Sequence, residues 1–307
     1  MLGITFVTFL FIHMAPGDFY DSLSLNPQIS KETLDSYRLR FNLDKPLLYQ
    51  YGAWLANMAR GRWGYSFTYN APVLKVIASR AFNTVLLSFS AIFFTWLLVI
   101  PLGVLVALNH GKFSERIVSF FSYLSISSPS FFIAFLLLYA VTVWGGLPLG
   151  GMRSLGFDDL SLWHKIADVA RHLVVPTIAL SLGSIASLQR IMKANLLEVL
   201  GSPCILAARA RGLSNNRILY VHALKNAFNP MITIFGYQFS ALLSGAALIE
   251  IITGWPGLGS VMLQAVRSQD LFLVMGSTVI SGLMLIAGNL LADIMLAAWD
   301  PRIRYER

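Results

Sequence analysis

Six long stretches of the chain are almost free of charged residues, and the polar residues gather between them. A bilayer core about 30 Å thick needs roughly 20 residues of helix, so five of the stretches are long enough to cross a membrane. They lack the ten-residue alternation of transmembrane barrel strands, so each is expected to be a helix. The stretches are residues 2–15, 84–107, 117–143, 173–192, 230–249 and 271–292.

The first stretch is too short to cross a bilayer comfortably. No Lys or Arg precedes Lys31, so this stretch lacks the basic flank of a secretory signal peptide. We interpret residues 1–15 as the remainder of a first transmembrane helix whose beginning is missing from this chain.

The pattern predicts an all-α polytopic membrane protein with about six transmembrane helices. Residues 16–82 form an external region that is expected to pack on the outer membrane surface. Residues 83–299 form a core of five helices, which a cytoplasmic loop at residues 196–228 interrupts, and residues 300–307 form a cytoplasmic tail. The sequence contains no visible internal repeat.

Composition and charge support a membrane protein. The chain is 56% hydrophobic and only 12% charged, with a mean hydropathy of +0.65. Its net charge of +8 could indicate nucleic acid binding, but 11 of the 23 Lys and Arg residues lie in residues 109–116, 190–225 and 300–307. These segments carry about +7 and the external loops about +3, so the positive-inside rule explains the charge and places the three segments in the cytoplasm. With six spans both termini are cytoplasmic, and no nucleic acid partner is expected.

A short basic segment of the cytoplasmic loop has the signals of a helix with defined ends. Ser202 can cap the first turn, and Pro203 suits the first helical position, where a missing N–H costs nothing. Gly212 supplies a left-handed residue to end the helix, and Ser214 can cap the next one. We predict a docking helix of about nine residues with a smooth side at its alanines, while an ordinary connector between spans is the alternative. The residues assigned to this docking interface are Ala207, Ala208, Arg209, Arg211, Gly212, Leu213 and Ser214.

The chain carries no motif of a familiar catalytic site. It contains no G-x-x-x-x-G-K-[ST], H-E-x-x-H or G-x-S-x-G sequence, which argues against a P-loop and against zinc or serine hydrolysis. Its one cysteine, Cys204, excludes an intramolecular disulfide and a cysteine metal cluster. We therefore expect a non-catalytic protein with no cofactor and no metal site.

Several short segments occur in an order that matches a known family. They are His13-Met14-Ala15-Pro16-Gly17-Asp18, residues 43–51, the Ala-Ala-x-x-x-Gly sequence and its continuation at residues 207–214, residues 222–230, Trp255-Pro256-Gly257-Leu258-Gly259, residues 289–293 and Asp300-Pro301-Arg302. The chain thereby resembles the membrane permease subunits of binding-protein-dependent ABC importers of the dipeptide and oligopeptide class. The resemblance covers essentially the whole chain.

The resemblance implies the type I ABC importer permease fold, a bacterial or archaeal cytoplasmic (inner) membrane location and a set of partners. These partners are a second homologous permease subunit, two ABC ATPase subunits, an external substrate-binding protein and the lipid bilayer. The short cytoplasmic helix would be the coupling helix, which sits in a groove of an ATPase and follows its ATP-driven movements. The chain departs from the family pattern at Pro203, Cys204 and Leu206, where members usually carry an acidic, an aromatic and a basic residue.

Two further groups of residues are candidates for the transport path. The external loop from Gly254 is rich in glycine and proline, which predicts a fixed turn that dips toward the external mouth of the path. Gly236, Ser240 and Ser244 form one stripe of small residues on the fifth span, for which close helix packing is the alternative. The gate candidates are Glu250, for which a structural role is the alternative, together with Trp255, Pro256, Gly257 and Gly259.

These observations together predict the transmembrane permease subunit of an ATP-driven importer, which forms half of the path for peptides or a similar small solute. An ion-coupled secondary transporter is the alternative function. Such transporters usually have intramembrane ionisable relays and two repeated halves, and the sequence displays neither. The substrate stays open among peptides, nickel chelates, glutathione and oligosaccharides, because the external binding protein of this permease type largely sets selectivity.

Overall fold

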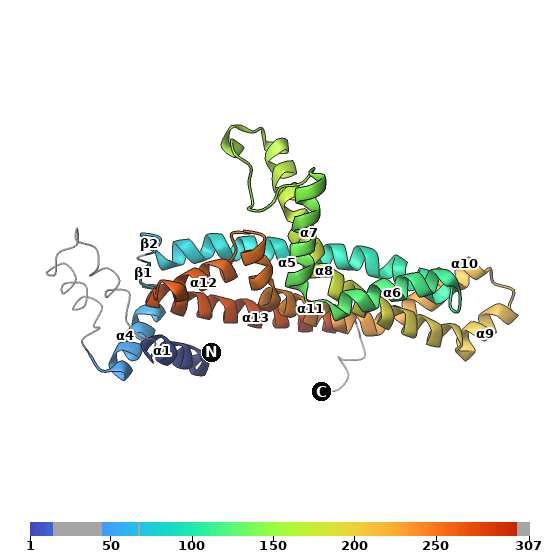
Figure 1. Cartoon of the computed structure of the whole chain (residues 1–307). Helices are drawn as coiled ribbons and strands as arrows, with labels where there is room; N and C mark the ends of the chain where they lie inside the picture. The colour runs from blue at the N-terminus through green and yellow to red at the C-terminus, as the bar shows by residue number, and fades with distance from the viewer. Residues whose placement is uncertain (15–44, 67, 300–307) are drawn as a thin grey trace, which may run out of the picture. The chain divides into compact units, whose positions relative to one another are not determined.

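The computed structural model describes residues 1–14, 45–66 and 68–299, and these residues are mostly helical (Figure 1). This confirms the predicted all-α class. The predicted tail at residues 300–307 and residues 16–44 of the external region lie outside the described residues. The elements are α1 (Leu2–Met14), α4 (Leu47–Ala59), β1 (Tyr65–Ser66), β2 (Ala71–Pro72), α5 (Val73–Leu108), α6 (Phe113–Ser127), α7 (Ser130–Trp144), the 3-10 helix η1 (Phe157–Asp159), α8 (Leu162–Leu200), α9 (Pro203–Ala210), α10 (Asn215–Arg217), the π-helix η2 (Ile218–Ala223), α11 (Leu224–Ile252), α12 (Leu258–Arg267) and α13 (Leu271–Trp299).

Three helices of the described part of the chain are long and apolar enough to cross a membrane, namely α5, α8 and Leu271–Leu291 of α13. Together α6 and α7 are also long and apolar enough for a span, and the two helices are bent by 110° at the break between them. The bend falls at Ser128 and Pro129, because Pro129 has no N–H with which to continue the hydrogen bonds of α6. The count of six spans stays a prediction.

The chain divides into two compact units, and two helices contribute to both. Unit 1 contains Met1–Thr84 and Pro256–Leu283, and unit 2 contains Val85–Trp255 and Met284–Arg307. The boundaries therefore fall within α5 and α13. The predicted boundary at residue 82 separates an external region from the helices of the membrane core. The division into compact units does not test that boundary, so it stays a prediction.

The core of unit 1 joins α1, α4 and the first part of α13. Aromatic and aliphatic side chains from the three helices pack together in it: Phe9, Trp54, Met275 and Val279. A hydrogen bond of 2.8 Å between Thr5 Oγ1 and Tyr51 OH links α1 to α4. The short apolar helix α1 is thus held to unit 1 by packing and by a polar contact.

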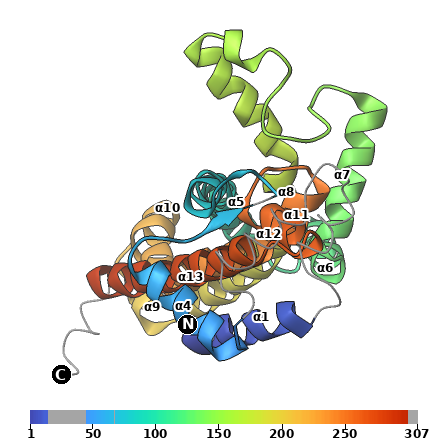
Figure 2. The same ribbon diagram turned by 90° about the vertical axis from the view of Figure 1, so that its left-hand side faces the viewer.

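Unit 2 is built around α8, which packs against α6, α7 and α11. Figures 1 and 2 show α7 and the beginning of α8 projecting from the rest of the unit, and Figure 2 shows that the two segments diverge. α5 approaches α8 closely because Gly103 has no side chain, since a Cβ atom there would lie 2.6 Å from Cγ of Met192.

Two apolar clusters lie in the described part of unit 2. The cluster near α9, called the α9 cluster below, consists of Val99, Ala107, Ile185, Leu188, Met192, Leu196, Ile205, Ala208, Ile218, Leu219, Ala223, Ala227 and Met231. The other, called the Trp255 cluster, consists of Leu87, Ala91, Ile92, Ala134, Ala179, Leu180, Ala246, Ile249 and Trp255. The α9 cluster connects the short helix α9 to three long helices, α5, α8 and α11.

Candidate functional site

The predicted short helix is present as α9, and it begins where the sequence signals place it, while its docking role stays a prediction. Ser202 occupies the N-cap position with extended backbone, and Pro203 is the first helical residue. The Ser202 side chain makes no capping hydrogen bond, so the start depends on Pro203, whose fixed φ angle suits a helix. Ser214 likewise occupies the N-cap position of α10 without a side-chain hydrogen bond.

The other end of α9 is closed by a Schellman motif. Gly212 is left-handed, with a φ angle of +76°. Its N–H donates to the Arg209 carbonyl at 2.9 Å, and the Leu213 N–H donates to the Ala208 carbonyl at 3.3 Å. These bonds satisfy carbonyl groups that a helix end otherwise leaves unpaired. Gly212 therefore ends the helix as predicted.

One side of α9 is anchored in the chain's own core. Ile205 is fully buried and Ala208 is 8% exposed, and both belong to the α9 cluster. The prediction that Ala207 and Ala208 together form one smooth outer side is wrong for Ala208, because this residue faces inward. Its small side chain allows close packing within the cluster, whereas Ala207 is exposed.

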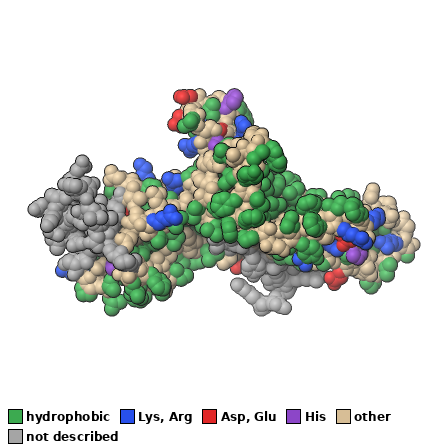
Figure 3. Space-filling model, in the orientation of Figure 1, with side chains coloured by type: hydrophobic (Ala, Val, Ile, Leu, Met, Phe, Trp, Pro, Cys, Tyr) green, Lys and Arg blue, Asp and Glu red, His purple; other side chains and the backbone are tan. Residues whose placement is uncertain are grey.

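The opposite side of α9 is exposed and basic. Figure 3 shows Lys and Arg side chains gathered at this end of unit 2. Leu206 is 55% exposed although it is apolar, so the outward side offers an aliphatic contact beside positive charge. The exposed residues of α9 and its C-terminal end are Pro203, Cys204, Leu206, Ala207, Arg209, Ala210, Arg211 and Gly212.

The turn after α11 is fixed by buried contacts. Gly254 has a φ angle of +64°, and Trp255 is completely buried in the Trp255 cluster. The Thr253 carbonyl accepts a hydrogen bond of 3.0 Å from the Gly151 N–H, which ties the turn to the loop after α7. Glu250 is also completely buried. The fixed turn is present as predicted, and its position at the mouth of a path stays a prediction.

The other gate candidates, Pro256, Gly257 and Gly259, lie in unit 1 at the start of α12. The Nδ2 group of Asn83 donates to the Pro256 carbonyl at 2.8 Å. Thr84 Oγ1 accepts the first N–H of α12, also at 2.8 Å. Within unit 1 these bonds hold the start of α12 against α5.

The path candidates Gly236, Ser240 and Ser244 lie on α11, but their side chains are outside the described residues, so their role stays a prediction. A buried polar contact nearby escaped the sequence analysis. Trp96 Nε1 donates to Gln238 Oε1 at 2.7 Å, joining α5 to α11. The signal available in the sequence was that Gln238 is the one amide side chain of the uncharged stretch 230–249.

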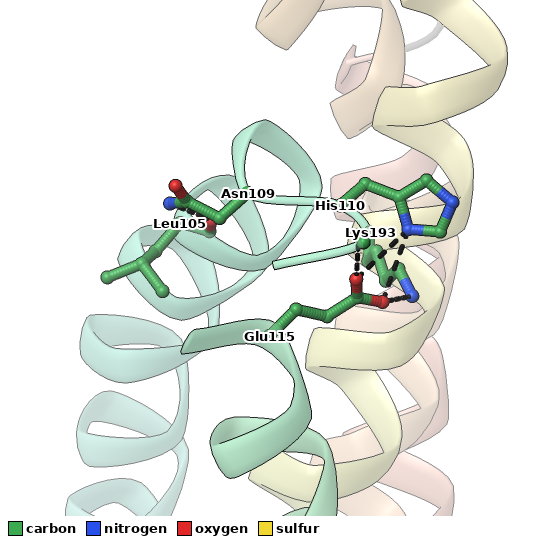
Figure 4. Close-up of polar contacts among 6 residues, drawn as sticks. Leu105, Asn109, His110, Glu115 and Lys193 are labelled. Carbon is green, nitrogen blue, oxygen red and sulfur yellow. Dashed lines mark hydrogen bonds and ion pairs between the residues drawn. The ribbon is translucent and has the colours of Figure 1, made fainter. Parts of the chain in front are cut away.

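A polar cluster at the α5–α6 turn also escaped the sequence analysis (Figure 4). The Glu115 carboxylate accepts hydrogen bonds from Lys193 Nζ on α8 and from the Gly111 N–H. Its Oε2 atom lies 3.1 Å from Nδ1 of His110. A signal for this cluster was present, because Glu115 is the one acidic residue of the basic stretch 109–116.

A second carboxylate organises the β-hairpin of unit 1. Asp270 Oδ2 accepts hydrogen bonds from Ser66 Oγ at 2.7 Å and from the Thr68 N–H at 3.2 Å. Tyr69 OH donates to Gln264 Oε1 at 2.6 Å. Burial raises the pKa of the Tyr69 phenol, so this group remains a donor. These bonds attach the hairpin to α12 and the start of α13.

The described part of the chain contains no group of three His, Cys, Asp or Glu side chains that could hold a metal ion. Two carboxylates at the ends of the helices, Glu115 and Asp270, instead accept hydrogen bonds from protein donors. These acidic residues fix turns and helices to one another.

Comparisons with known proteins agree with one another. The family described as "Binding-protein-dependent transport system inner membrane component" matches residues 99–305. The chain is 34% identical to the oligopeptide transport system permease protein AppB of Bacillus subtilis, over 99% of this chain and 95% of that protein. It is 33% identical to the dipeptide transport system permease protein DppB of Escherichia coli, over 100% of this chain and 95% of that protein. A solved structure of the MetNI methionine ABC transporter in inward facing conformations is similar in fold, with a TM-score of 0.54 and 18% identity over 73% of this chain and 98% of that chain.

Proposed function

The chain belongs to the family of binding-protein-dependent transport system inner membrane components, and from that premise we propose that it forms half of the translocation path of an ATP-driven peptide importer. It is a membrane-embedded permease subunit. We further propose that α9 is the coupling helix, through which separate ATPase subunits drive the path between outward and inward access.

The observation that carries this proposal is the two-sided character of α9. Its inward residues Ile205 and Ala208 are packed in a cluster that includes residues of α5, α8 and α11, so a movement of α9 would act on those helices through this packing. Its outward side is exposed and carries Arg209 and Arg211. A short rod with both ends fixed transmits force, whereas a flexible connector would absorb it.

The proposed complex contains a second homologous permease subunit, two ABC ATPases and an external substrate-binding protein. The positive charge of the segment that contains α9 supports a cytoplasmic position for it, which also places both termini in the cytoplasm if the chain has six spans. Hydrolysis of ATP belongs to the partner ATPases, since this chain has no P-loop sequence.

Peptides are the proposed substrate class. The support for this is that the relatives AppB and DppB are named as oligopeptide and dipeptide permeases and are similar to nearly the whole chain. Within this class, the length and composition of the peptide depend on the external binding protein.

Ala207→Glu tests the coupling helix directly. The change places a negative charge on the outward side of α9, where it meets the proposed ATPase surface but none of the chain's own core. We expect substrate-stimulated ATP hydrolysis by the assembled complex to fall about tenfold, the effect of roughly 1.4 kcal/mol lost at the interface. Ala207→Ser is the matched control, and it should keep full stimulation.

Full stimulation of ATP hydrolysis in Ala207→Glu would show that α9 is not part of the coupling interface. A different result would overturn the wider proposal: transport by the purified chain alone, without nucleotide, would identify an ion-coupled secondary transporter.

A further inference from the structure

The cluster around Glu115 joins the α5–α6 turn to α8 shortly before that helix leads into α9. The Glu115 carboxylate pairs with the Lys193 ammonium group, and their side chains are only 12% and 23% exposed. The same carboxylate accepts the Gly111 N–H. Hydrogen bonds between charged groups are stronger than neutral ones, and shelter from water reduces their screening.

The turn that carries this cluster is internally fixed. Gly111 has a φ angle of +83°, which suits a tight turn. Lys112 Nζ donates to Asn109 Oδ1 at 3.2 Å. Asn109 Nδ2 donates to the Leu105 carbonyl at 2.8 Å (Figure 4). These bonds fix the turn that carries Glu115 to the end of α5.

A second contact fixes α6 to α8 about one helical turn away from Lys193. Gln189 Nε2 donates to Ser122 Oγ at 3.0 Å, and both residues are buried. Between these two polar contacts, Met192 of α8 lies in the α9 cluster with Ile205 and Ala208 of α9. The part of α8 that holds α9 is therefore also the part that holds α6.

We propose that the Glu115–Lys193 ion pair is a positioning element, which makes the α5–α6 turn and α6 follow α8 when α9 moves. The inference deepens the proposed function and rests on α9 being the coupling helix. The Ser122–Gln189 hydrogen bond holds α6 to α8 at one point, and the ion pair adds a second fixed point at the α5–α6 turn. Two fixed points set the register between the two helices, so that a displacement of α8 reaches the bent helix pair formed by α6 and α7.

The test measures how much substrate the complex, reconstituted in proteoliposomes, transports per ATP hydrolysed. Glu115→Gln and Lys193→Gln should each lower this ratio by about fivefold or more. The double variant should be no worse than either single variant, because both changes remove the same interaction. Lys193→Arg keeps the charge and should restore the ratio. Asp168→Asn on α8 is the matched control, since its carboxylate accepts hydrogen bonds from Ser154 and lies beside His172, in the first part of α8 and away from Lys193, and it should leave the ratio unchanged.

An unchanged ratio in the two single Gln variants would overturn the inference. So would variants that fail to assemble, because the pair would then be needed for folding alone. Ala207→Glu in the same assay distinguishes a failure of this inference from a failure of the proposed function. If Ala207→Glu uncouples the complex and the Gln variants do not, only the positioning role is wrong.

Discussion

At the residue scale, Gly212 fixes the point at which α9 ends. The site has open space, with no heavy atom within 4 Å of the position that a Cβ atom would take, but its φ angle is +76°. Gly212→Val therefore strains the backbone without a steric clash, at a cost of about 1 to 2 kcal/mol. We expect the Schellman motif to open, and substrate-stimulated ATP hydrolysis by the assembled complex to fall.

Gly212→Asn is the matched control, because asparagine tolerates the left-handed conformation better than other residues with a side chain. It should keep most of the stimulation. Equal activity in the Val and Asn variants would mean that a fixed helix end is unnecessary for coupling.

Single residues also show which features of the candidate site the sequence predicts and which it does not. Ser202, Pro203 and Gly212 act through their own backbone, so the ends of α9 are predictable locally. Its inward side is set by packing on α8 and η2, and no local signal distinguishes Ala207 from Ala208. The Glu115–Lys193 pair was missed for the same reason, since 78 positions separate its two partners.

At the scale of elements, the close approach of α5 to α8 depends on Gly103. A Cβ atom at this position would lie 2.6 Å from Cγ and 2.8 Å from Cβ of Met192, both near the α8 backbone. Gly103→Ala should therefore destabilise unit 2 by about 1 to 3 kcal/mol through overpacking. A lower midpoint of thermal unfolding of the protein in detergent would reveal this.

Two further variants serve as comparisons for the unfolding midpoint of Gly103→Ala. Gly183→Ala on α8 meets nothing within 4 Å and should be neutral or stabilising, because alanine favours helix. Met192→Ala, which leaves a cavity in the α9 cluster, should cost less stability in the Gly103→Ala background than in the unchanged protein, because it removes the crowding atom Cγ there. If Gly103→Ala unfolds like the unchanged protein, the two helices are less closely packed than the structure indicates.

The elements themselves were partly predictable. The uncharged stretches correctly predict α5, α8 and α13, because a long apolar run is a local property. They predict neither the 110° bend at Pro129 nor the length of α8, which has 39 residues. A proline indicates where a helix breaks, whereas the angle is set by packing on neighbouring helices. The additional length of α8 comes from amphipathic flanks, which a search for uncharged runs leaves out.

At the scale of the whole molecule, the distribution of positive charge and the position of α9 agree with one orientation of the chain in the membrane. The basic segments 109–116 and 190–225 meet in unit 2 through Glu115 and Lys193, so they belong to the same side of the membrane. The positive-inside rule assigns that side to the cytoplasm, where we propose that the ATPases bind. The central claim is that the outward side of α9 faces the cytoplasm and is covered by an ATPase.

The single cysteine of the chain tests this claim without any change in sequence. Cys204 is exposed on the outward side of α9. A membrane-impermeant maleimide is added to intact cells, to inverted vesicles stripped of ATPases, and to the same vesicles after the cognate ATPases are restored. Cys204→Ser provides the unlabelled control. Leu155→Cys in the Cys204→Ser background provides the external control, because Leu155 is fully exposed in the loop between α7 and α8.

We predict that the maleimide leaves Cys204 unlabelled in intact cells, labels it rapidly in stripped inverted vesicles, and labels it several-fold more slowly once the ATPases are bound. The Leu155→Cys control should be labelled in intact cells and be insensitive to the ATPases. Labelling of Cys204 from outside intact cells would reverse the orientation of the chain, and labelling at the same rate with and without the ATPases would contradict docking on α9.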